Sequence, residues 1–184
     1  AVPKGEGGML AILGSDIDTI EKNFEENKSQ FKCFIANDNS NGQIVASGTM
    51  ENINKLSKDL TSKNIKNIKL SVSAPFHCNL MNKATEIMKK EIERLDFKIF
   101  ETPLISNVTA VEIKDNSSLK NLLIQQIESR VRWRESVLYM IDNGVKQFIE
   151  IGPGKVLSGL IKRIDRSVKI SAINNEEDIN IIKI

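Results

Sequence analysis

The order of short apolar runs in the first 72 residues constrains the fold more than any other feature of this sequence. Such runs, bounded by polar or Gly-rich stretches, are typical of strands, and they cover residues 9–13, 31–36, 43–47 and 65–72. Between the first and second runs, and again between the third and fourth, apolar residues recur three and four positions apart, which predicts a helix in each interval. The polar stretch 37–42 predicts a hairpin turn. This βαββαβ order predicts a ferredoxin-like subdomain over residues 8–72 with an antiparallel sheet.

The remaining residues, 73–184, alternate expected helices with expected strands. Helical spacing of apolar residues predicts helices over 81–95, 115–127, 133–142 and 155–164. We expect the apolar stripe of the first of these helices to lie in the core. Short apolar runs predict strands over 104–106, 147–151 and 168–172. The alternation is typical of a largely parallel sheet, so the predicted fold class is mixed α/β.

His77 is the only histidine of the chain, and it follows an expected strand and Pro75. Asn79 is expected to cap the helix that comes next. His77 is therefore predicted in a strand-to-helix turn, where a side chain can face a cleft. Imidazole titrates near neutral pH, so such a histidine can accept and return a proton. The alternative is a histidine that only bonds the local backbone.

Composition excludes several classes of function. The formal net charge is only +2, so no strong field attracts nucleic acid or an anionic membrane. No expected strand carries the paired aromatic residues that stack RNA bases, and no apolar run reaches the roughly 18 residues of a membrane-spanning helix. One histidine and two distant cysteines, Cys33 and Cys78, do not give the spacing of a metal site. We expect no metal, no cofactor and a reducing, cytoplasmic compartment.

Several stretches together resemble the malonyl-CoA:acyl-carrier-protein transacylases. The stretch around His77, Ser73-Ala-Pro-Phe-His-Cys-Asn-Leu-Met81, resembles the histidine signature of that family. Four other stretches resemble family motifs in the same order along the chain: Ala1–Met9, Ile105–Val108, Val131–Val137 and Phe148–Leu157. The resemblance implies that residues 73–184 are the carboxyl-terminal part of a larger α/β-hydrolase-like subdomain, into which the ferredoxin-like unit is inserted.

The resemblance also implies a chemistry. In the family a serine on a Gly-x-Ser-x-Gly elbow carries the acyl group between coenzyme A and the phosphopantetheine thiol of the acyl carrier protein. His77 would be the base, oriented by the main-chain carbonyl of Arg132, and Asn107 would support the site. The alternatives are that Arg132 is a solvated residue at a helix start and that Asn107 only forms a turn. The sequence contains no such elbow. We therefore expect the chain to supply the base but no nucleophile, and to be inactive alone.

A basic stretch near the carboxyl end has two interpretations. Lys155, Lys162, Arg163 and Arg166 are either a solvated surface or a docking site for an acidic acyl carrier protein. Gly152-Pro-Gly-Lys155 lacks the phosphate-loop pattern and predicts a tight turn.

The sequence thus favours a partial S-malonyltransferase of fatty-acid synthesis. Its expected partners are malonyl-CoA, the acyl carrier protein and an amino-terminal half on a separate chain. The alternative is a non-catalytic remnant that keeps the fold and can still bind the carrier protein. A generic ferredoxin-like module is disfavoured by the motifs after residue 73.

Overall fold

The computed structural model describes residues 2–3, 5–72, 74–98 and 100–181. The first region follows the predicted order of elements: β1 (Gly7–Leu13), α1 (Ile17–Glu26), β2 (Cys33–Ser40), β3 (Gln43–Thr49), α2 (Met50–Ser62) and β4 (Lys66–Lys69). The four strands form one antiparallel sheet in the order β2-β3-β1-β4. The expected element order and antiparallel sheet are confirmed.

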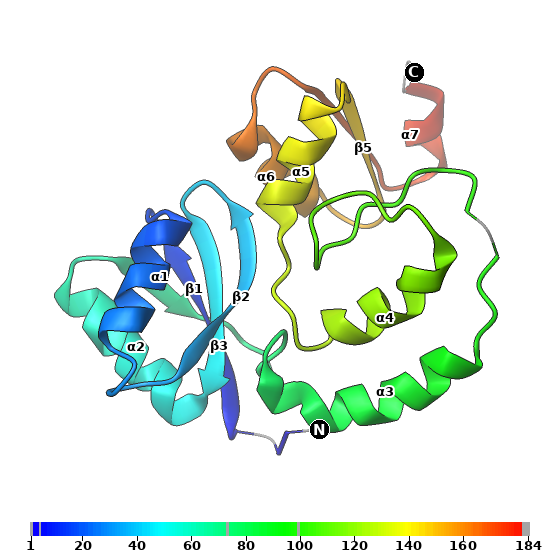
Figure 1. The fold of residues 1–184 in the computed structure, drawn as a ribbon. Coiled ribbons are helices and arrows are strands. Elements are labelled where there is room, and N and C mark those ends of the chain that lie inside the picture. Colours follow the sequence, from blue (N-terminus) through cyan, green and yellow to red (C-terminus); the bar gives the residue numbers. More distant parts are fainter. Residues whose placement is uncertain (1, 4, 73, 99, 182–184) are drawn as a thin grey trace.

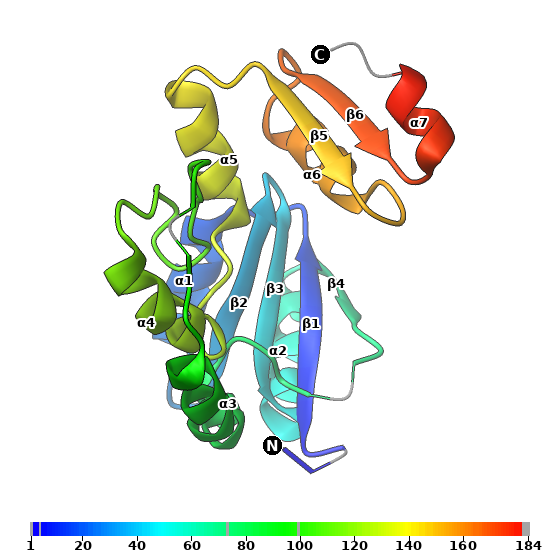
Figure 2. The same cartoon turned by 90° about the vertical axis from the view of Figure 1, so that its right-hand side faces the viewer.

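Helices α1 and α2 cover one face of this sheet (Figure 1). Each begins at a side-chain cap, because Asp16 accepts from the Thr19 N–H and Thr49 accepts from the Asn52 N–H. The core between the helices and the sheet consists of buried apolar residues: Leu10, Ile12, Ile20, Phe31, Ile44, Ala46, Ile53, Leu56 and Leu60. On the opposite face, the connection from β4 to α3 crosses the sheet (Figure 2).

The hairpin between β2 and β3 corrects one expectation. Polar residues 37–40 continue strand β2 instead of forming the turn, which is confined to Asn41 and Gly42. Irregular register between Ile35 and Ser40 lets this polar segment remain paired with β3. The polar composition of residues 37–42 indicated a turn, but Asp38 is buried where it forms an ion pair with a distant part of the chain, described below.

The second region is mainly helical. It comprises a short 3₁₀ turn (Asn79–Met81), α3 (Asn82–Arg94), α4 (Asn116–Gln126), α5 (Trp133–Asp142), β5 (Gln147–Ile151), α6 (Val156–Ile164), β6 (Lys169–Ile173) and α7 (Glu176–Ile181). Strands β5 and β6 pair in parallel, as expected. Val137, Phe148 and Ile161 form the buried centre of a smaller cluster between α5, α6 and this sheet.

Three expectations for this region were wrong, and α7 was not predicted. Residues 104–106 make only an isolated bridge, between Ile105 and Glu112, because no strand of the described chain runs beside them. The apolar stripe of α3 is mostly exposed, with only Ile92 buried in that helix. Asn79 lies within the 3₁₀ turn and does not cap α3.

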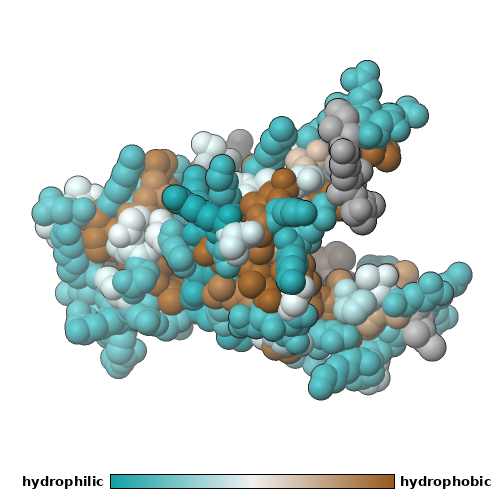
Figure 3. Space-filling view, turned by 90° about the horizontal axis from the view of Figure 1, so that it is seen from above, coloured by the Kyte–Doolittle hydropathy of each residue, from teal (hydrophilic) through white to brown (hydrophobic). Residues whose placement is uncertain are grey.

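Apolar surface is visible beside a hollow between two projecting parts of the molecule (Figure 3).

Candidate functional site

His77 lies in the connection between β4 and α3, where the sequence places the candidate base. Its φ angle is 59°, in the left-handed region. This conformation costs a residue with a side chain about 1–2 kcal/mol. Such a backbone persists only where surrounding contacts determine it, so the contacts that hold this turn matter for the site.

Two contacts hold the turn on the sheet, and a third braces the turn internally. The Ser47 hydroxyl, on β3, donates to the Phe76 carbonyl at 2.5 Å. The Cys78 thiol donates to the Pro75 carbonyl at 3.1 Å. Pro75 is fully buried and lies so close to Gly7 of β1 that a Cβ atom there would be 2.3 Å from the proline ring. Only glycine at position 7 admits this packing, so β1 and β3 together position the two residues that precede His77.

The imidazole ring is oriented by a main-chain carbonyl. His77 Nδ1 lies 3.0 Å from the Gln126 carbonyl oxygen, and the side chain is half-buried. A carbonyl only accepts hydrogen bonds, so Nδ1 carries the proton of the neutral ring. Nε2 then has the free lone pair, which is the state that a general base needs. The ring bonds the backbone through one nitrogen and keeps the other for chemistry.

The acceptor is Gln126 and not Arg132, which corrects the sequence expectation. Gln126 is the last residue of α4, where carbonyl groups have no partner within the helix, and its carbonyl is available to His77. Arg132 precedes α5 instead. Its carbonyl accepts from the N–H and the hydroxyl of Ser136, at 2.9 and 2.8 Å, as expected at the start of a helix. The acceptor thus lies at the end of α4, five residues before the Val131–Val137 stretch in which the resemblance placed it.

Asn107 and Arg132 contact each other and not His77. The Arg132 N–H donates to the Asn107 carbonyl at 3.0 Å. The Arg132 guanidinium donates to Glu135, and this hydrogen bond raises the pKa of Arg132. Arg130 joins the same cluster, with ion pairs to Glu135 at 3.2 Å and to Glu21 of α1 at 2.8 Å. These bonds fix the segment between α4 and α5 that begins just after the His77 acceptor.

A second set of contacts fastens this segment to β2. Val131 pairs with the strand, accepting from the Asp38 N–H at 2.9 Å and donating to the Ala36 carbonyl at 2.8 Å. The carboxylate of Asp38 accepts hydrogen bonds from Arg134 Nε at 2.9 and 3.1 Å and forms an ion pair with Arg134 Nη2 at 2.9 Å. The Asp38 side chain is 1% exposed. The hydrogen bonds to Asp38 raise the pKa of Arg134, and the pair holds α5 against the sheet.

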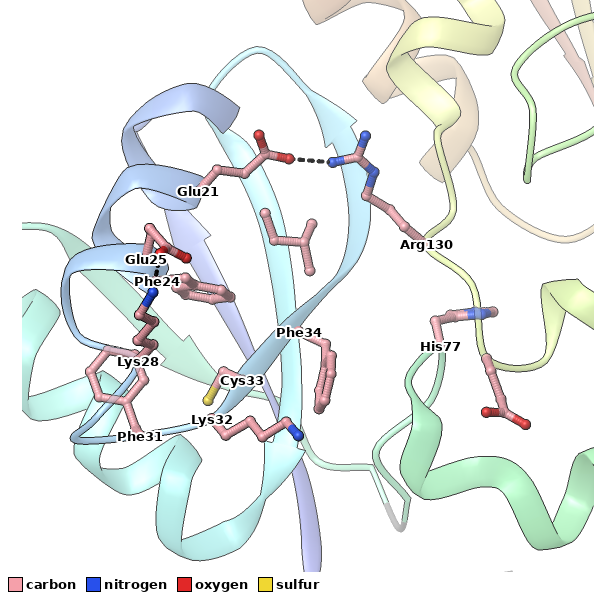
Figure 4. Close-up of a pocket in the computed structure, with 12 residues that line it drawn as sticks. Glu21, Phe24, Glu25, Lys28, Phe31, Lys32, Cys33, Phe34, His77 and Arg130 are labelled. Carbon is pink, nitrogen blue, oxygen red and sulfur yellow. Dashed lines mark hydrogen bonds and ion pairs between the residues drawn. The ribbon is translucent and has the colours of Figure 1, made fainter.

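A cavity of about 740 Å³ lies beside His77, between the first region and the segment that precedes α5. Figure 4 shows Arg130 and Glu21 meeting across its upper side, with His77 on the far wall from α1. Aromatic residues supply much of its lining: Phe24, Phe31 and Phe34. Six of the twelve lining residues are charged: Glu21, Glu25, Lys28, Lys32, Glu128 and Arg130. Aromatic surface combined with charged groups suits a flexible ligand with polar ends.

The two cysteines near the site are neutral thiols. Cys33, on the cavity wall, has its pKa raised to about 12 by burial. Burial also raises the pKa of Cys78. Both are free. Because the thiolate is the reactive form, neither residue competes with a serine as nucleophile.

The basic residues near α6 divide into two groups. Lys155, Lys162 and Arg166 line a separate cavity of about 440 Å³, whereas Arg163 donates to the Gln43 side chain on the hairpin. The turn at Gly152-Pro-Gly-Lys155 is confirmed, with φ of 137° at Gly152 and 93° at Gly154.

The side chain of Glu150, a residue of β5, lies at the amino-terminal end of α6. Its carboxylate accepts from the N–H groups of Leu157 and Ser158 at 3.0 and 2.7 Å. These are the backbone donors that a phosphate loop would offer to an anion, so the protein's own carboxylate takes the place of a phosphate.

Across the described ranges, no three His, Cys, Asp or Glu side chains are grouped so as to hold a metal ion. Within the same ranges, no helix has the length and apolar character that would let it cross a bilayer.

Sequence signals could have found some of the missed residues. Gln126 ends a helix whose carboxyl end was predicted within a residue, and a free terminal carbonyl there is expected. Ser47 and Asp38 gave no such signal, because their roles depend on partners 29 and 96 positions away.

Comparison with known proteins identifies the relatives. No family model matches the chain. A curated protein from Bacillus subtilis, named malonyl CoA-acyl carrier protein transacylase, is 41% identical over 184 residues, which cover 98% of this chain. Its namesake from Staphylococcus aureus strain MSSA476 is 40% identical over 183 residues, which cover 97% of this chain. The chain spans 58% and 59% of the lengths of these two relatives.

Solved structures show the same likeness. An acyl-carrier-protein S-malonyltransferase from Bartonella henselae superposes with a TM-score of 0.93 at 38% identity, covering 98% of this chain and 58% of that one. A malonyl-transacylase solved in complex with a type II PKS acyl-carrier protein superposes with a TM-score of 0.91 at 32% identity, covering 97% of this chain and 57% of that one.

Proposed function

Because this chain belongs to the malonyl CoA-acyl carrier protein transacylase family, as a carboxyl-terminal portion, we propose that it supplies the histidine base for transfer of malonyl from malonyl-CoA to the acyl carrier protein. The observation that carries this proposal is the state of His77. One ring nitrogen is held by a carbonyl at 3.0 Å, the other keeps its lone pair, and the residue borders a cavity lined by aromatic and charged residues.

The proposed reaction has two halves. His77 Nε2 accepts the proton of an elbow serine, which attacks the thioester carbonyl of malonyl-CoA, and the same nitrogen then returns that proton to the departing coenzyme A thiolate. In the second half, His77 accepts the proton of the phosphopantetheine thiol as it attacks the serine ester, and returns it to the serine oxygen. The Gln126 carbonyl stabilises the charged imidazolium in each half. No cofactor or metal is needed in this scheme.

The serine must come from outside the 184 residues, which contain no Gly-x-Ser-x-Gly sequence. We propose that residues 8–72 are the ferredoxin-like small subdomain and that residues 73–184 are part of an α/β-hydrolase-like subdomain. The rest of that subdomain would carry the elbow, either in the same polypeptide or on a separate chain. The parallel pairing of β5 with β6 is consistent with this division. A cytoplasmic location remains a prediction.

We assign carrier-protein docking to the cavity near α6. Lys155, Lys162 and Arg166 place three positive charges around it, and no acidic residue among those that the structure describes lines it. Such a surface attracts an acidic protein and speeds its association. Arg163 is engaged by Gln43 and is proposed at the edge of the docking surface. A relative of similar fold has been solved with its acyl-carrier protein, which supports the class of partner.

The test is a malonyl-transfer assay with malonyl-CoA and acyl carrier protein. The chain is assayed alone and mixed with the portion of the Bacillus subtilis relative that it does not match. We expect no transfer by the chain alone and transfer by the mixture. His77→Ala should lower the mixture's rate by up to about a million-fold, the loss seen when a triad base is removed.

Asn64→Ala is the matched control, because Asn64 also has a left-handed backbone, with φ of 60°, but does not line the His77 cavity. It should leave the rate unchanged. Robust transfer by the chain alone, or full activity of the His77→Ala mixture, would contradict the proposal. Binding of acyl carrier protein without transfer by the mixture would favour the non-catalytic remnant.

A further inference from the structure

The connection that carries His77 depends on one buried hydroxyl from another element. Ser47 is 0% exposed, and its hydroxyl donates to the Phe76 carbonyl at 2.5 Å. That carbonyl belongs to the peptide group between Phe76 and His77. The orientation of this peptide plane sets the φ angle of His77, which is 59°. The hydrogen bond therefore acts on the one dihedral angle of His77 that is strained.

Within the described residues, no second hydrogen bond holds this peptide plane. The Cys78 thiol holds the preceding carbonyl, that of Pro75, and the Phe76 side chain is exposed. Ser47 sits in the middle of β3, paired with Met9 on one side and Phe34 on the other. Its hydroxyl is therefore delivered from a rigid sheet, whereas the turn it holds is an irregular connection.

We propose that Ser47 is a positioning residue for the base: its hydroxyl holds the Phe76–His77 peptide in the orientation that brings His77 Nδ1 to the Gln126 carbonyl. Without the hydroxyl, the peptide can rotate and relieve the left-handed conformation. The ring then leaves Gln126, and Nδ1 loses the acceptor that keeps its proton. This inference rests on the proposed function, since it explains how the proposed base is held.

The experiment uses the imidazole of His77, the only histidine in these 184 residues, as a spectroscopic probe. In nitrogen-15-labelled chain, two-bond proton–nitrogen correlation spectra report which ring nitrogen carries the proton. We expect the Nδ1–H form in the unaltered chain. Ser47→Ala should shift the population toward the Nε2–H form, which free histidine prefers in water, and Ser47→Thr should restore the Nδ1–H form because it keeps a hydroxyl.

Ser40→Ala is the matched control. Ser40 is 1% exposed, lies on the neighbouring strand β2, and its hydroxyl has no hydrogen-bond partner in the described chain. It should leave the tautomer unchanged, although both alanine variants remove a buried hydroxyl. An unchanged tautomer in Ser47→Ala, or an equal shift in Ser40→Ala, would overturn the inference.

If Ser47→Ala does not fold, the unaltered chain still decides the matter. The Ser47 hydroxyl proton should exchange slowly with water and show a nuclear Overhauser effect to Phe76 or His77, and rapid exchange would overturn the inference. In the complemented transfer assay, Ser47→Ala should lower kcat roughly tenfold and leave KM nearly unchanged. The tautomer is measured without turnover, so the inference and the proposed function can fail separately.

Discussion

The two regions of the molecule bury their apolar residues to very different extents. The first, from β1 to β4, encloses nine buried apolar residues between one sheet and two helices. The second, from α3 to α7, has a cluster with only three buried members around a sheet of two strands. It also leaves Ile87, Ile151 and Val156 exposed by 64%, 79% and 71%.

The difference separates a unit that closes its own core from one that depends on neighbours. A two-stranded sheet is marginal on its own, and clustered exposed apolar residues are typical of surfaces that another element covers. The proposed base site lies where the two regions meet: the His77 turn packs on β1 and β3, while its acceptor comes from α4. The geometry of the site therefore depends on the contacts between the regions as well as on each core.

The largest expected effect is a cavity in the closed core. Leu56→Ala, at a residue with 0% exposure, should lower the free energy of unfolding by about 3–5 kcal/mol. Ile87→Ala, on the exposed stripe of α3, should change it by at most about 0.5 kcal/mol. Urea denaturation followed by circular dichroism measures both. Equal losses in the two variants would show that the second region buries its apolar residues as tightly as the first.

The next largest effect concerns the ion pair between Asp38 and Arg134, which joins the two regions. Asp38→Asn should lower the free energy of unfolding by about 2–3 kcal/mol, because Arg134 would keep a partly buried charge without its carboxylate partner. Glu25→Gln, which breaks an exposed ion pair with Lys28, should cost about 0.5 kcal/mol or less. Hydrogen exchange should locate the loss in α5. A loss spread evenly over both regions would contradict the role of Asp38 as a tie.

These contrasts explain what the sequence could and could not predict. The order βαββαβ was predictable because short apolar runs and apolar residues three and four positions apart dominate wherever a core closes locally. Residues 37–40 were misassigned to a turn, since the ion pair that buries Asp38 comes from Arg134, 96 positions away. The stripe of α3 was misassigned to the core, because periodicity shows an apolar face but not what covers it.

The site was predictable to the same degree. The His77 turn could be found from its local motif, and the expected backbone acceptor exists. The end of α4 at Gln126 was predicted within one residue, but which carbonyl meets His77 depends on how α4 packs beside the turn, and no local pattern specifies that packing. The hydrogen bond from Ser47 joins two elements 29 positions apart, and no local pattern announces it.

A smaller effect tests the exposed edge of the second region. Strand β5 pairs only with β6 within the described chain, and Ile151 at its end is 79% exposed. Ile151→Lys should reduce self-association in sedimentation velocity and change the free energy of unfolding by less than about 0.5 kcal/mol. Ile179→Lys is the control, since Ile179 is 58% exposed on α7, away from the strand edge. An equal reduction by both variants would mean that added charge, and not the edge, controls association.

The smallest expected effect is a pH dependence at α6. Hydrogen bonds from Ser158 and Leu157 hold the pKa of Glu150 below its ordinary range, with the contact to Ser158 the larger cause. A carboxylate whose pKa is lowered by folding stabilises the folded chain above its unfolded pKa, near 4.3, and this contribution is lost as pH falls through the folded pKa. Glu150→Gln removes the charge at every pH. The variant should therefore melt at a lower temperature than the unaltered chain at pH 7, and the difference should shrink toward pH 3. Thermal unfolding across this range measures it, and a difference that stays constant with pH would show that the carboxylate at the start of α6 acts through hydrogen bonding alone.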